Sequence, residues 1–217
     1  PLILYGRSTS RVQKPAFMLE LLGLDCVRVE MPTPPPAAYK AVNPVGLVPA
    51  LKVADGAHWT TLTDSNSICV FLAERFGGGS GMMPTGVALG AALQWSAFVE
   101  YYLATPRLNP LYHGVVHSRY PPSVGKPGCP PADALQTHED DSVSALSVLE
   151  AHMTGKDFIV GPCMTFADVC TAPWLHRWHE HAARGEYGPR LAPDQFPALA
   201  RYYQSMASLP AFKATVS

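Results

Sequence analysis

The chain has 217 residues, of which 47% are hydrophobic and 15% are charged, and its formal net charge is −1. This composition is that of a well-packed globular protein and excludes a disordered chain. A net charge so close to zero gives no electrostatic reason to expect nucleic acid or an anionic membrane as a partner. No apolar run approaches the roughly 20 residues that span a bilayer, and the first residues lack the basic flank of a signal peptide.

The cysteines are odd in number and include no CxxC pair. Most of them lie inside apolar segments, so we expect reduced, buried thiols and a cytoplasmic location. The five are Cys26, Cys69, Cys129, Cys163 and Cys170.

The first third of the chain alternates between strand and helix patterns. Strands are predicted at residues 2–5, 26–30, 50–53 and 59–62. A helical period of apolar residues between the first two strands predicts a helix that ends at Gly23, with Pro15 early in it, where a missing N–H is best tolerated. The last two strands are separated by an Asp55–Gly56 turn, and Asp64 can then cap a second helix.

A glycine-rich stretch at residues 77–81 breaks all periodicity and predicts a domain boundary. Only helical patterns follow it. We therefore predict an α+β protein with an α/β domain over residues 1–77, a linker over residues 78–86 and an all-α domain over residues 87–217.

The helical half begins with a pattern from Val87 to about Val116, which Pro106 and Pro110 should kink or break. Residues 118–131 are rich in Pro, Gly and Ser and predict a loop. Thr165 and Asp168 have the spacing of a capping box. Further helices are predicted over residues 135–153, from Thr165, over residues 197–206 and from Pro210.

Three segments in this order carry a family pattern: YGRSTSRV at residues 5–12, NPVGLVPAL at 43–51 and DSNSI at 64–68. They are similar to the catalytic turn, the NPxGxVPxL loop and the [ED]SxxI motif of cytosolic glutathione transferases of bacterial, theta-like or phi-like type. Residues 165–174 resemble the family's [ST]xAD segment, so the resemblance spans the chain. It implies a thioredoxin-like first domain, glutathione as co-substrate, a small hydrophobic electrophile as second substrate, a homodimer and a role in detoxification.

The resemblance also assigns the residues that hold glutathione. In the family the Val–Pro peptide is cis, and the residue before the proline presents its backbone to the cysteinyl part, which points to Val48 and Pro49. Asp64 and Ser65 then hold the γ-glutamyl group: the ammonium pairs with Asp64, and the carboxylate accepts hydrogen bonds from Ser65 and the helix N–H groups.

A cation is expected to bind the glycyl carboxylate of glutathione. Lys40 is the positional candidate, with Arg11 and Lys14 behind it. The alternative for Lys40 is a solvated surface lysine without a ligand.

In these family branches a serine near the start of the first helix donates a hydrogen bond to the glutathione sulfur and stabilises the thiolate. Ser10, directly before Arg11, fits this pattern and is the catalytic candidate. The turn is one residue shorter than the common SSxNVxK form, so Ser8 or Thr9 can align instead, and Ser8 is kept as a glutathione contact. Tyr5 is a further candidate, although at the end of a strand it favours a core position.

An aromatic stripe in the first helix of the all-α domain is a candidate lining for the second-substrate site, with a core position as the alternative. The stripe consists of Trp95, Phe98, Tyr101, Tyr102 and Tyr112.

Two other functions stay open. The first is a glutathione-dependent isomerase like maleylacetoacetate isomerase, although the turn lacks the cysteine of that branch. The second is a non-catalytic binding module with the same fold. His176 and His179 share a helix face, but no further pattern completes a metal site, so no metal is predicted. Trp174 and Trp178 are interpreted as core.

Overall fold

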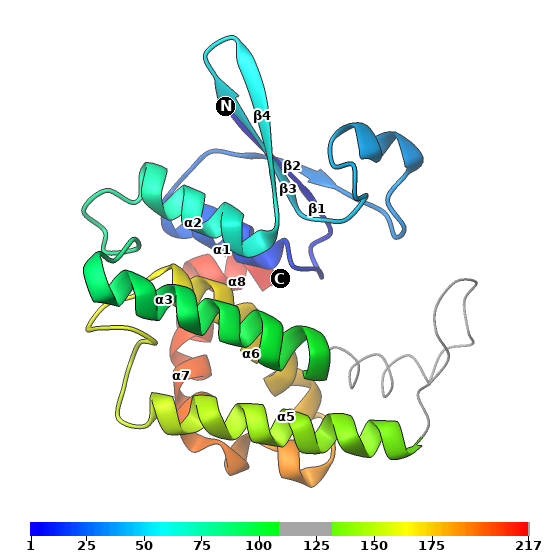
Figure 1. Ribbon diagram of the computed structural model, residues 1–217, viewed down its shortest axis with the longest axis vertical. Coiled ribbons are helices and arrows are strands. Elements are labelled where there is room, and N and C mark those ends of the chain that lie inside the picture. Colours follow the sequence, from blue (N-terminus) through cyan, green and yellow to red (C-terminus); the bar gives the residue numbers. More distant parts are fainter. Residues whose placement is uncertain (109–131, 217) are drawn as a thin grey trace.

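The computed structural model describes residues 1–108 and 132–216, which form a sheet-containing domain followed by a helical domain (Figure 1). The strands are β1 Leu2–Gly6, β2 Val27–Glu30, β3 Ala50–Asp55 and β4 His58–Thr63. Their order in the sheet is β2-β1-β3-β4, with β1 parallel to β2, and with β3 antiparallel to both of its neighbours. The predicted strands and the α+β class are confirmed.

Two helices and a short 3₁₀ segment complete the first domain. They are α1 Gln13–Leu21, α2 Ser65–Phe76 and η1 Ala37–Ala41. The chain passes from β1 to α1 by a close approach at Gly6, where a Cβ atom would lie 2.4 Å from the Val12 side chain. Only glycine fits there, because any side chain would displace the start of the turn that leads into α1.

The second domain is helical in all its described elements. They are α3 Gly86–Phe98, the π-helical η2 Val99–Leu108, α5 Ala132–Met153, α6 Phe166–Ala183, the 3₁₀ turns η3 Pro189–Leu191 and η4 Pro193–Gln195, α7 Pro197–Ser208 and α8 Pro210–Val216. The glycine-rich stretch lies between α2 and α3. The residue boundaries assigned to the two domains stay a prediction. In the part of the chain that the structure describes, none of the helices has the length and hydrophobicity of a membrane span.

The core is continuous between the two domains. Helix α6 runs through the centre of the helical domain and contacts α1 and α2 as well as α3 and α7. Trp178 is 1% exposed there, and Trp174 is 4% exposed, which confirms both as core residues. Helix α8 returns to the first domain beside α1 (Figure 1). Phe17 and Phe212 meet edge to face between these two helices, with their ring centroids 5.0 Å apart.

The first helix of the second domain differs from its prediction. Its α-helical geometry ends at Phe98, and a π-helical segment begins at Val99, upstream of the proline at 106 that was expected to cause the break. A π-helical turn holds an extra residue, which changes the face that each later side chain presents. The rest of that prediction, with Pro110, Val116 and the loop at residues 118–131, lies outside the described residues.

The expectation of buried thiols is wrong for one cysteine. Cys69 and Cys170 are buried and Cys26 is half-buried, but Cys163 is exposed because it lies in the loop before α6 rather than in a helix. Burial raises the pKa of the Cys69 thiol. Cys129 lies outside the described residues.

The predicted capping box at the start of α6 is confirmed. Asp168 is fully buried and accepts hydrogen bonds from the backbone N–H groups of Thr165 (2.8 Å) and Ile159 (2.9 Å) and from the hydroxyl of Tyr202 (2.9 Å). Burial raises the pKa of Asp168, although these donors oppose the change. One carboxylate thus ties the start of α6 to the preceding loop and to α7.

Replacing Asp168 by alanine is expected to lower the free energy of unfolding by about 3–5 kcal/mol, because several buried donors lose their acceptor together. Urea unfolding followed by circular dichroism measures the change. Asp157→Ala is the matched control: its carboxylate is 82% exposed and pairs with Arg201, so its loss should cost about 0–1 kcal/mol. Equal losses for the two variants would contradict the role given to the buried carboxylate.

Candidate active site

The turn that joins β1 to α1 places its three hydroxyl residues differently. Ser10 is half-buried; its hydroxyl donates to the carbonyl of Arg7 (2.6 Å) and accepts from the backbone N–H of Val12 (3.3 Å). Thr9 is exposed, and its carbonyl accepts from a guanidinium N–H of Arg177 at 3.1 Å. Ser8 is also exposed, and it faces a different hollow, bordered by β2 and α8.

Ser10 borders a small hollow between the two domains, which we call the interdomain hollow. It has a volume of about 10 Å³, room for roughly one water-sized group. Its lining includes Ser10, Arg11, Lys14, Pro173, Trp174 and Arg177. Of the hydroxyl side chains in the turn, Ser10 alone belongs to this lining.

Tyr5 takes the core position that its strand favoured. Its ring packs against Tyr39 with the ring centroids 6.0 Å apart, in a small apolar cluster with Met31 and Ala50. This packing accounts for an aromatic side chain at position 5 without a role in catalysis.

The loop before Pro49 is shaped by one buried amide. Asn43 is 3% exposed; its Nδ2 donates to the carbonyl of Leu47 (2.6 Å), and its Oδ1 accepts from the N–H of Val45 (3.1 Å). Gly46 within the loop has φ of 75°, which glycine adopts without strain. The Val48–Pro49 peptide bond is cis, as predicted.

Lys40 lies on η1, with its side chain exposed and its methylene stem beside Gly46. The lysine is therefore adjacent to the loop that carries Val48 and Pro49. Its contact with a glycyl carboxylate stays a prediction.

Asp64 and Ser65 begin helix α2, as predicted. Asp64 is the N-cap, and its carboxylate accepts from the backbone N–H of Ser67 at 2.8 Å. Its φ of 70° is uncommon for a residue other than glycine, and such backbone conformations concentrate at functional sites. Ser65 is 2% exposed, at a helix end whose dipole favours an anion.

A buried ionic network joins this region to the helical domain. Lys14 is 1% exposed, and its Nζ lies 2.5 Å from Glu100 Oε2 and 2.8 Å from Asn66 Oδ1. The same carboxylate accepts from Trp174 Nε1 at 3.2 Å, and its other oxygen lies 3.2 Å from an Nη of Arg11. Glu100 thereby connects η2 to α1 and α6, and Lys14 connects α1 to α2.

The sequence interpretation missed two members of this region, Glu100 and Arg177. Glu100 could have been noticed, because it is the single charge in the apolar run from 97 to 106. The position of Lys14 also disagrees with its candidacy for the glycyl carboxylate, since its ammonium is buried against Glu100. Arg177 carried no signal, because an arginine in a histidine-rich helix end is typical of a solvated face.

Some residues of the aromatic stripe pack against neighbouring rings, and others are exposed. Trp95 stacks on His152 with centroids 3.8 Å apart, and Phe98 stacks on Tyr102 at 5.7 Å. Tyr101 is 68% exposed. Tyr112 lies outside the described residues. The assignment of the stripe to a second-substrate site stays a prediction.

Two histidines of α6 pack against Tyr203 of α7. His176 Nδ1 lies 2.9 Å from the hydroxyl of Tyr203, and His179 lies against the same ring with centroids 4.4 Å apart. Burial lowers the pKa of both imidazoles. The contact with Tyr203 accounts for the two histidines on one helix face without a metal ion.

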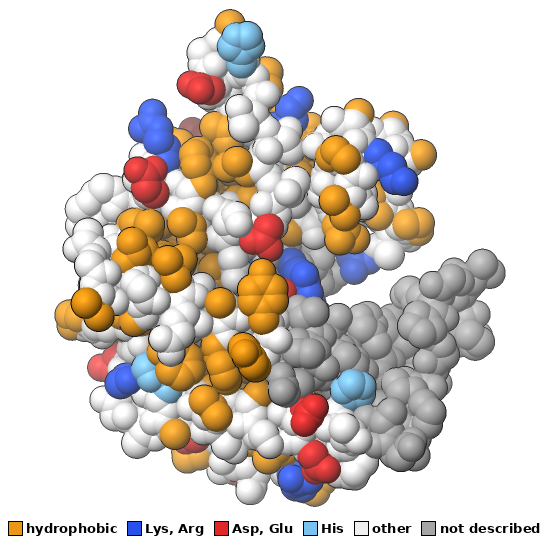
Figure 2. Space-filling model, in the orientation of Figure 1, with side chains coloured by type: hydrophobic (Ala, Val, Ile, Leu, Met, Phe, Trp, Pro, Cys, Tyr) orange, Lys and Arg blue, Asp and Glu red, His pale blue; other side chains and the backbone are white. Residues whose placement is uncertain are grey.

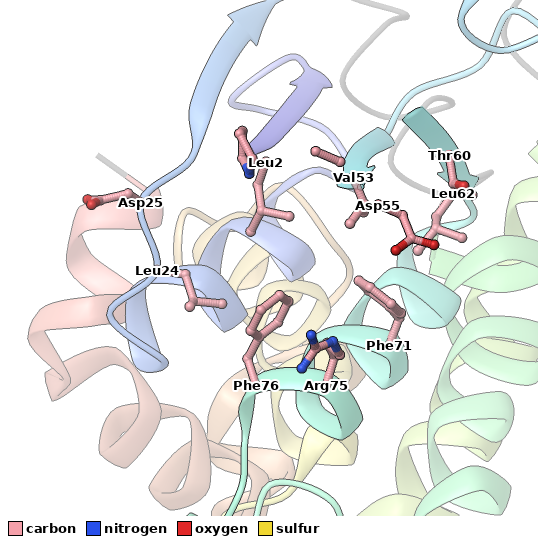
Figure 3. Close-up of a pocket in the computed structure, with 12 residues that line it drawn as sticks. Leu2, Leu24, Asp25, Val53, Asp55, Thr60, Leu62, Phe71, Arg75 and Phe76 are labelled. Carbon is pink, nitrogen blue, oxygen red and sulfur yellow. The ribbon is translucent and has the colours of Figure 1, made fainter. Parts of the chain in front are cut away.

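A wider hollow of about 600 Å³ lies elsewhere, between the sheet and the ends of α1 and α2 (Figure 3). Phe71, Arg75 and Phe76 of α2 point into it opposite Leu2 and Val53 of the strands (Figure 3). None of the residues predicted to bind glutathione lines it. The candidate site is therefore the region at Ser10, the cis-proline loop and the start of α2.

Comparison with known families agrees with this layout. The N-terminal domain of glutathione S-transferases matches residues 10–75, and the C-terminal domain of glutathione S-transferases matches residues 132–205. Glutathione S-transferase 3 of Zea mays is 30% identical over 228 residues, which cover 100% of this chain and 94% of that protein. The chain belongs to the glutathione S-transferase family. Family membership and the predicted two-domain fold are thereby confirmed.

Solved structures show the same fold. The apo structure of glutathione S-transferase III has a TM-score of 0.78 at 25% identity and covers 100% of this chain and 95% of that chain. A glutathione transferase of Pseudomonas putida, solved with one glutathione disulfide bound per subunit, has a TM-score of 0.81 at 20% identity, with 100% and 90% covered. Elongation factor 1-gamma of Sus scrofa is 25% identical over 80% of this chain and 35% of its own length.

Proposed function

We propose that the protein binds glutathione at the start of α2 and the cis-proline loop, and transfers its thiolate to an electrophilic carbon of an apolar or aromatic second substrate. Ser10 donates the hydrogen bond that stabilises the thiolate. Val48 and Pro49 pair with the cysteinyl backbone, Asp64 and Ser65 hold the γ-glutamyl group, and Lys40 and Ser8 approach the rest of the tripeptide.

The observation that supports this proposal is a hydrogen bond between the first turns of two helices, α1, which follows Ser10, and α2, which begins at Ser65 after Asp64. Lys14 of α1 and Asn66 of α2 share a hydrogen bond, so the turn with Ser10 and the cap with Asp64 are held in a fixed relation. Helix starts present N–H groups and a positive dipole end, which favour both a carboxylate and a thiolate.

Retention on immobilised glutathione, followed by an assay with an aromatic electrophile, tests the proposal. A transferase is retained and consumes thiol. The isomerase would be retained and would isomerise the cis double bond of an enone without net loss of thiol, whereas a binding module would be retained without turnover. Failure to bind glutathione at millimolar concentration would refute the proposal.

We also propose a cytoplasmic location, a role in detoxification and a homodimer. The dimer has support on one face, where hydrophobic side chains gather over α2 and α3 (Figure 2). On these two helices, Phe76, Val87 and Leu93 are 37%, 92% and 45% exposed, and exposed apolar side chains gathered on one face are typical of an interaction surface.

Light scattering at micromolar concentration is expected to show a dimer. Leu93→Asp should weaken the association about tenfold or more, because it would bury a charge in an apolar contact. Val27→Asp is the matched control, since Val27 is 61% exposed on the edge strand β2 and away from α3. A wild-type monomer, or equal weakening by both variants, would contradict the dimer.

A further inference from the structure

The side-chain amide of Asn66 contacts both domains. Asn66 is half-buried in the first turn of α2, one residue after Ser65. Its Oδ1 accepts a hydrogen bond from Lys14 Nζ of α1 at 2.8 Å, and its Nδ2 donates to the backbone carbonyl of Ser96 in α3 at 3.3 Å. An ammonium can only donate and a carbonyl can only accept, so the two contacts together fix the orientation of the amide.

A second contact from the first domain reaches the same part of the helical domain. Lys14 Nζ lies 2.5 Å from Glu100 Oε2 of η2, and Glu100 is four residues after Ser96 in the chain. Residues four apart lie on one side of a helix. Asn66 and Lys14 therefore hold each other and also hold two points of one continuous helical segment. We call Lys14, Asn66, Ser96 and Glu100 the polar clamp.

The helix changes its geometry between these two points. Helix α3 ends at Phe98, and the π-helical η2 begins at Val99. The Ser96 carbonyl accepts from the backbone N–H of Val99 as well as from Asn66, so both of its lone pairs are used. A side chain that joins the hydrogen bonds of a helix is one cause of such a change, and π-helical turns are frequent at functional sites. The amide of Asn66 thus lies where the direction of the later side chains is set.

The residues around this change belong to the aromatic stripe, the predicted lining of the second-substrate site. Phe98 and Tyr102 lie on either side of the start of η2, and their rings stack with centroids 5.7 Å apart. Asn66 itself directly follows Ser65, which is proposed to hold the γ-glutamyl group. One side chain therefore joins the helix of the glutathione site to the helix of the second-substrate site.

We propose that Asn66 is a positioning residue for the second substrate: its hydrogen bond to the Ser96 carbonyl holds the aromatic stripe at a fixed position relative to the glutathione bound at the start of α2. This inference rests on the proposed function and adds the contact that aligns its two binding sites. A misplacement of about 1 Å between reacting groups can lower a rate about a hundredfold, so a reaction of two substrates depends on such an alignment. An aromatic ring attached to the glutathione sulfur then binds with full affinity only while the amide contact is present.

The test uses two analogues that contain the same tripeptide. S-Benzylglutathione places an aromatic ring beside the sulfur, and S-methylglutathione places only a methyl group there. The ratio of their dissociation constants, measured by isothermal titration calorimetry, reports on binding of the ring, because the tripeptide contributes to both. Asn66→Ala is expected to lower the preference for the benzyl compound about two- to tenfold, which corresponds to the loss of one hydrogen bond.

Two further variants locate the effect. At neutral pH Asn66→Asp keeps an acceptor for Lys14 but has no donor for the Ser96 carbonyl, so it should lower the preference as Asn66→Ala does. Its added charge acts on the tripeptide of both analogues and cancels in the ratio. Ser67→Ala is the matched control in the same turn of α2, because its side chain is exposed and its backbone N–H, not its hydroxyl, donates to Asp64. Ser67→Ala should leave the preference unchanged.

Equal loss of affinity for both analogues in Asn66→Ala would overturn the inference, because Asn66 would then act on the glutathione site alone. A wild-type preference in Asn66→Asp would also overturn it, since the contact with Ser96 would not be needed. The same holds if the wild-type protein does not prefer the benzyl compound at all. If the preference exists and depends on Asn66, but no electrophile is conjugated, the proposed transferase function fails and the positioning role stands.

Discussion

Ser10→Ala is expected to slow conjugation at neutral pH about ten- to a hundredfold. A hydrogen bond to a charged acceptor contributes about 1.5–3 kcal/mol, and here it stabilises the thiolate over the thiol. The Ser10 hydroxyl donates to the Arg7 carbonyl at 2.6 Å, so it must turn toward the sulfur when it donates to the thiolate. Glutathione affinity should hardly change, because Val48, Asp64 and Ser65 hold the rest of the peptide.

The pH profile separates this role from a structural one. Loss of the donor raises the pKa of the bound thiol, so the thiolate fraction at neutral pH falls and recovers as the pH rises. The deficit of Ser10→Ala should therefore shrink in alkaline buffer, whereas a misfolded turn would leave it constant. Titration of the thiolate absorbance of the bound glutathione measures the same change directly.

Ser8→Ala and Thr9→Val are the matched comparisons in the same turn. Both side chains are exposed, and Ser8 faces the hollow beside β2, so we expect neither variant to reproduce the loss. Full activity in Ser10→Ala with loss in Thr9→Val would move the sulfur contact to Thr9. Full activity in all three would leave thiolate stabilisation to backbone N–H groups and Arg11.

Most of the fold could be predicted from the sequence, because over most of the chain the local sequence pattern indicates the same element that the packing of the buried side chains requires. Strands with a clear apolar pattern, the Asp55–Gly56 turn and the Thr165–Asp168 capping box each depend on a few adjacent residues. The change to π-helical geometry at Val99 has no such local cause. It coincides with the burial of Glu100 against a residue 86 positions earlier in the chain, which no window along the sequence contains.

The candidate site also contains residues that the sequence predicted and residues that it did not. The resemblance of short motifs to the family predicted the cis bond at Val48–Pro49 and the helix start at Asp64, because each motif consists of residues adjacent in the chain. Glu100 and Arg177 lie far from these motifs, and their importance arises only when α6 and η2 pack against α1. Contacts between the two domains therefore bring Glu100 and Arg177 to the site, and the short motifs carry no information about these contacts.

Glu100→Gln is expected to lower the free energy of unfolding about as much as Asp168→Ala does. It keeps the shape of the side chain but leaves the Lys14 ammonium, 1% exposed, without its carboxylate. Breaking a buried ion pair in this way costs about 3–5 kcal/mol, whereas its contribution relative to a well-packed apolar pair is close to zero. Lys14→Met should cost less, because Arg11 still compensates Glu100.

The two single variants and the double variant form a thermodynamic cycle measured by urea unfolding. The double variant Lys14→Met/Glu100→Gln should be more stable than Glu100→Gln alone, since no uncompensated charge stays buried. Glu20→Gln is the control in the same domain: its pair with Arg28 is over 40% exposed on both sides and should contribute about 0–1 kcal/mol. Two outcomes would contradict this role of the Glu100 carboxylate. The first is a loss of unfolding free energy in Glu100→Gln no larger than that in Glu20→Gln, and the second is simple addition of the losses of the two single variants. In either case the carboxylate would not be what holds the turn with Ser10 and the start of α2 against the helical domain.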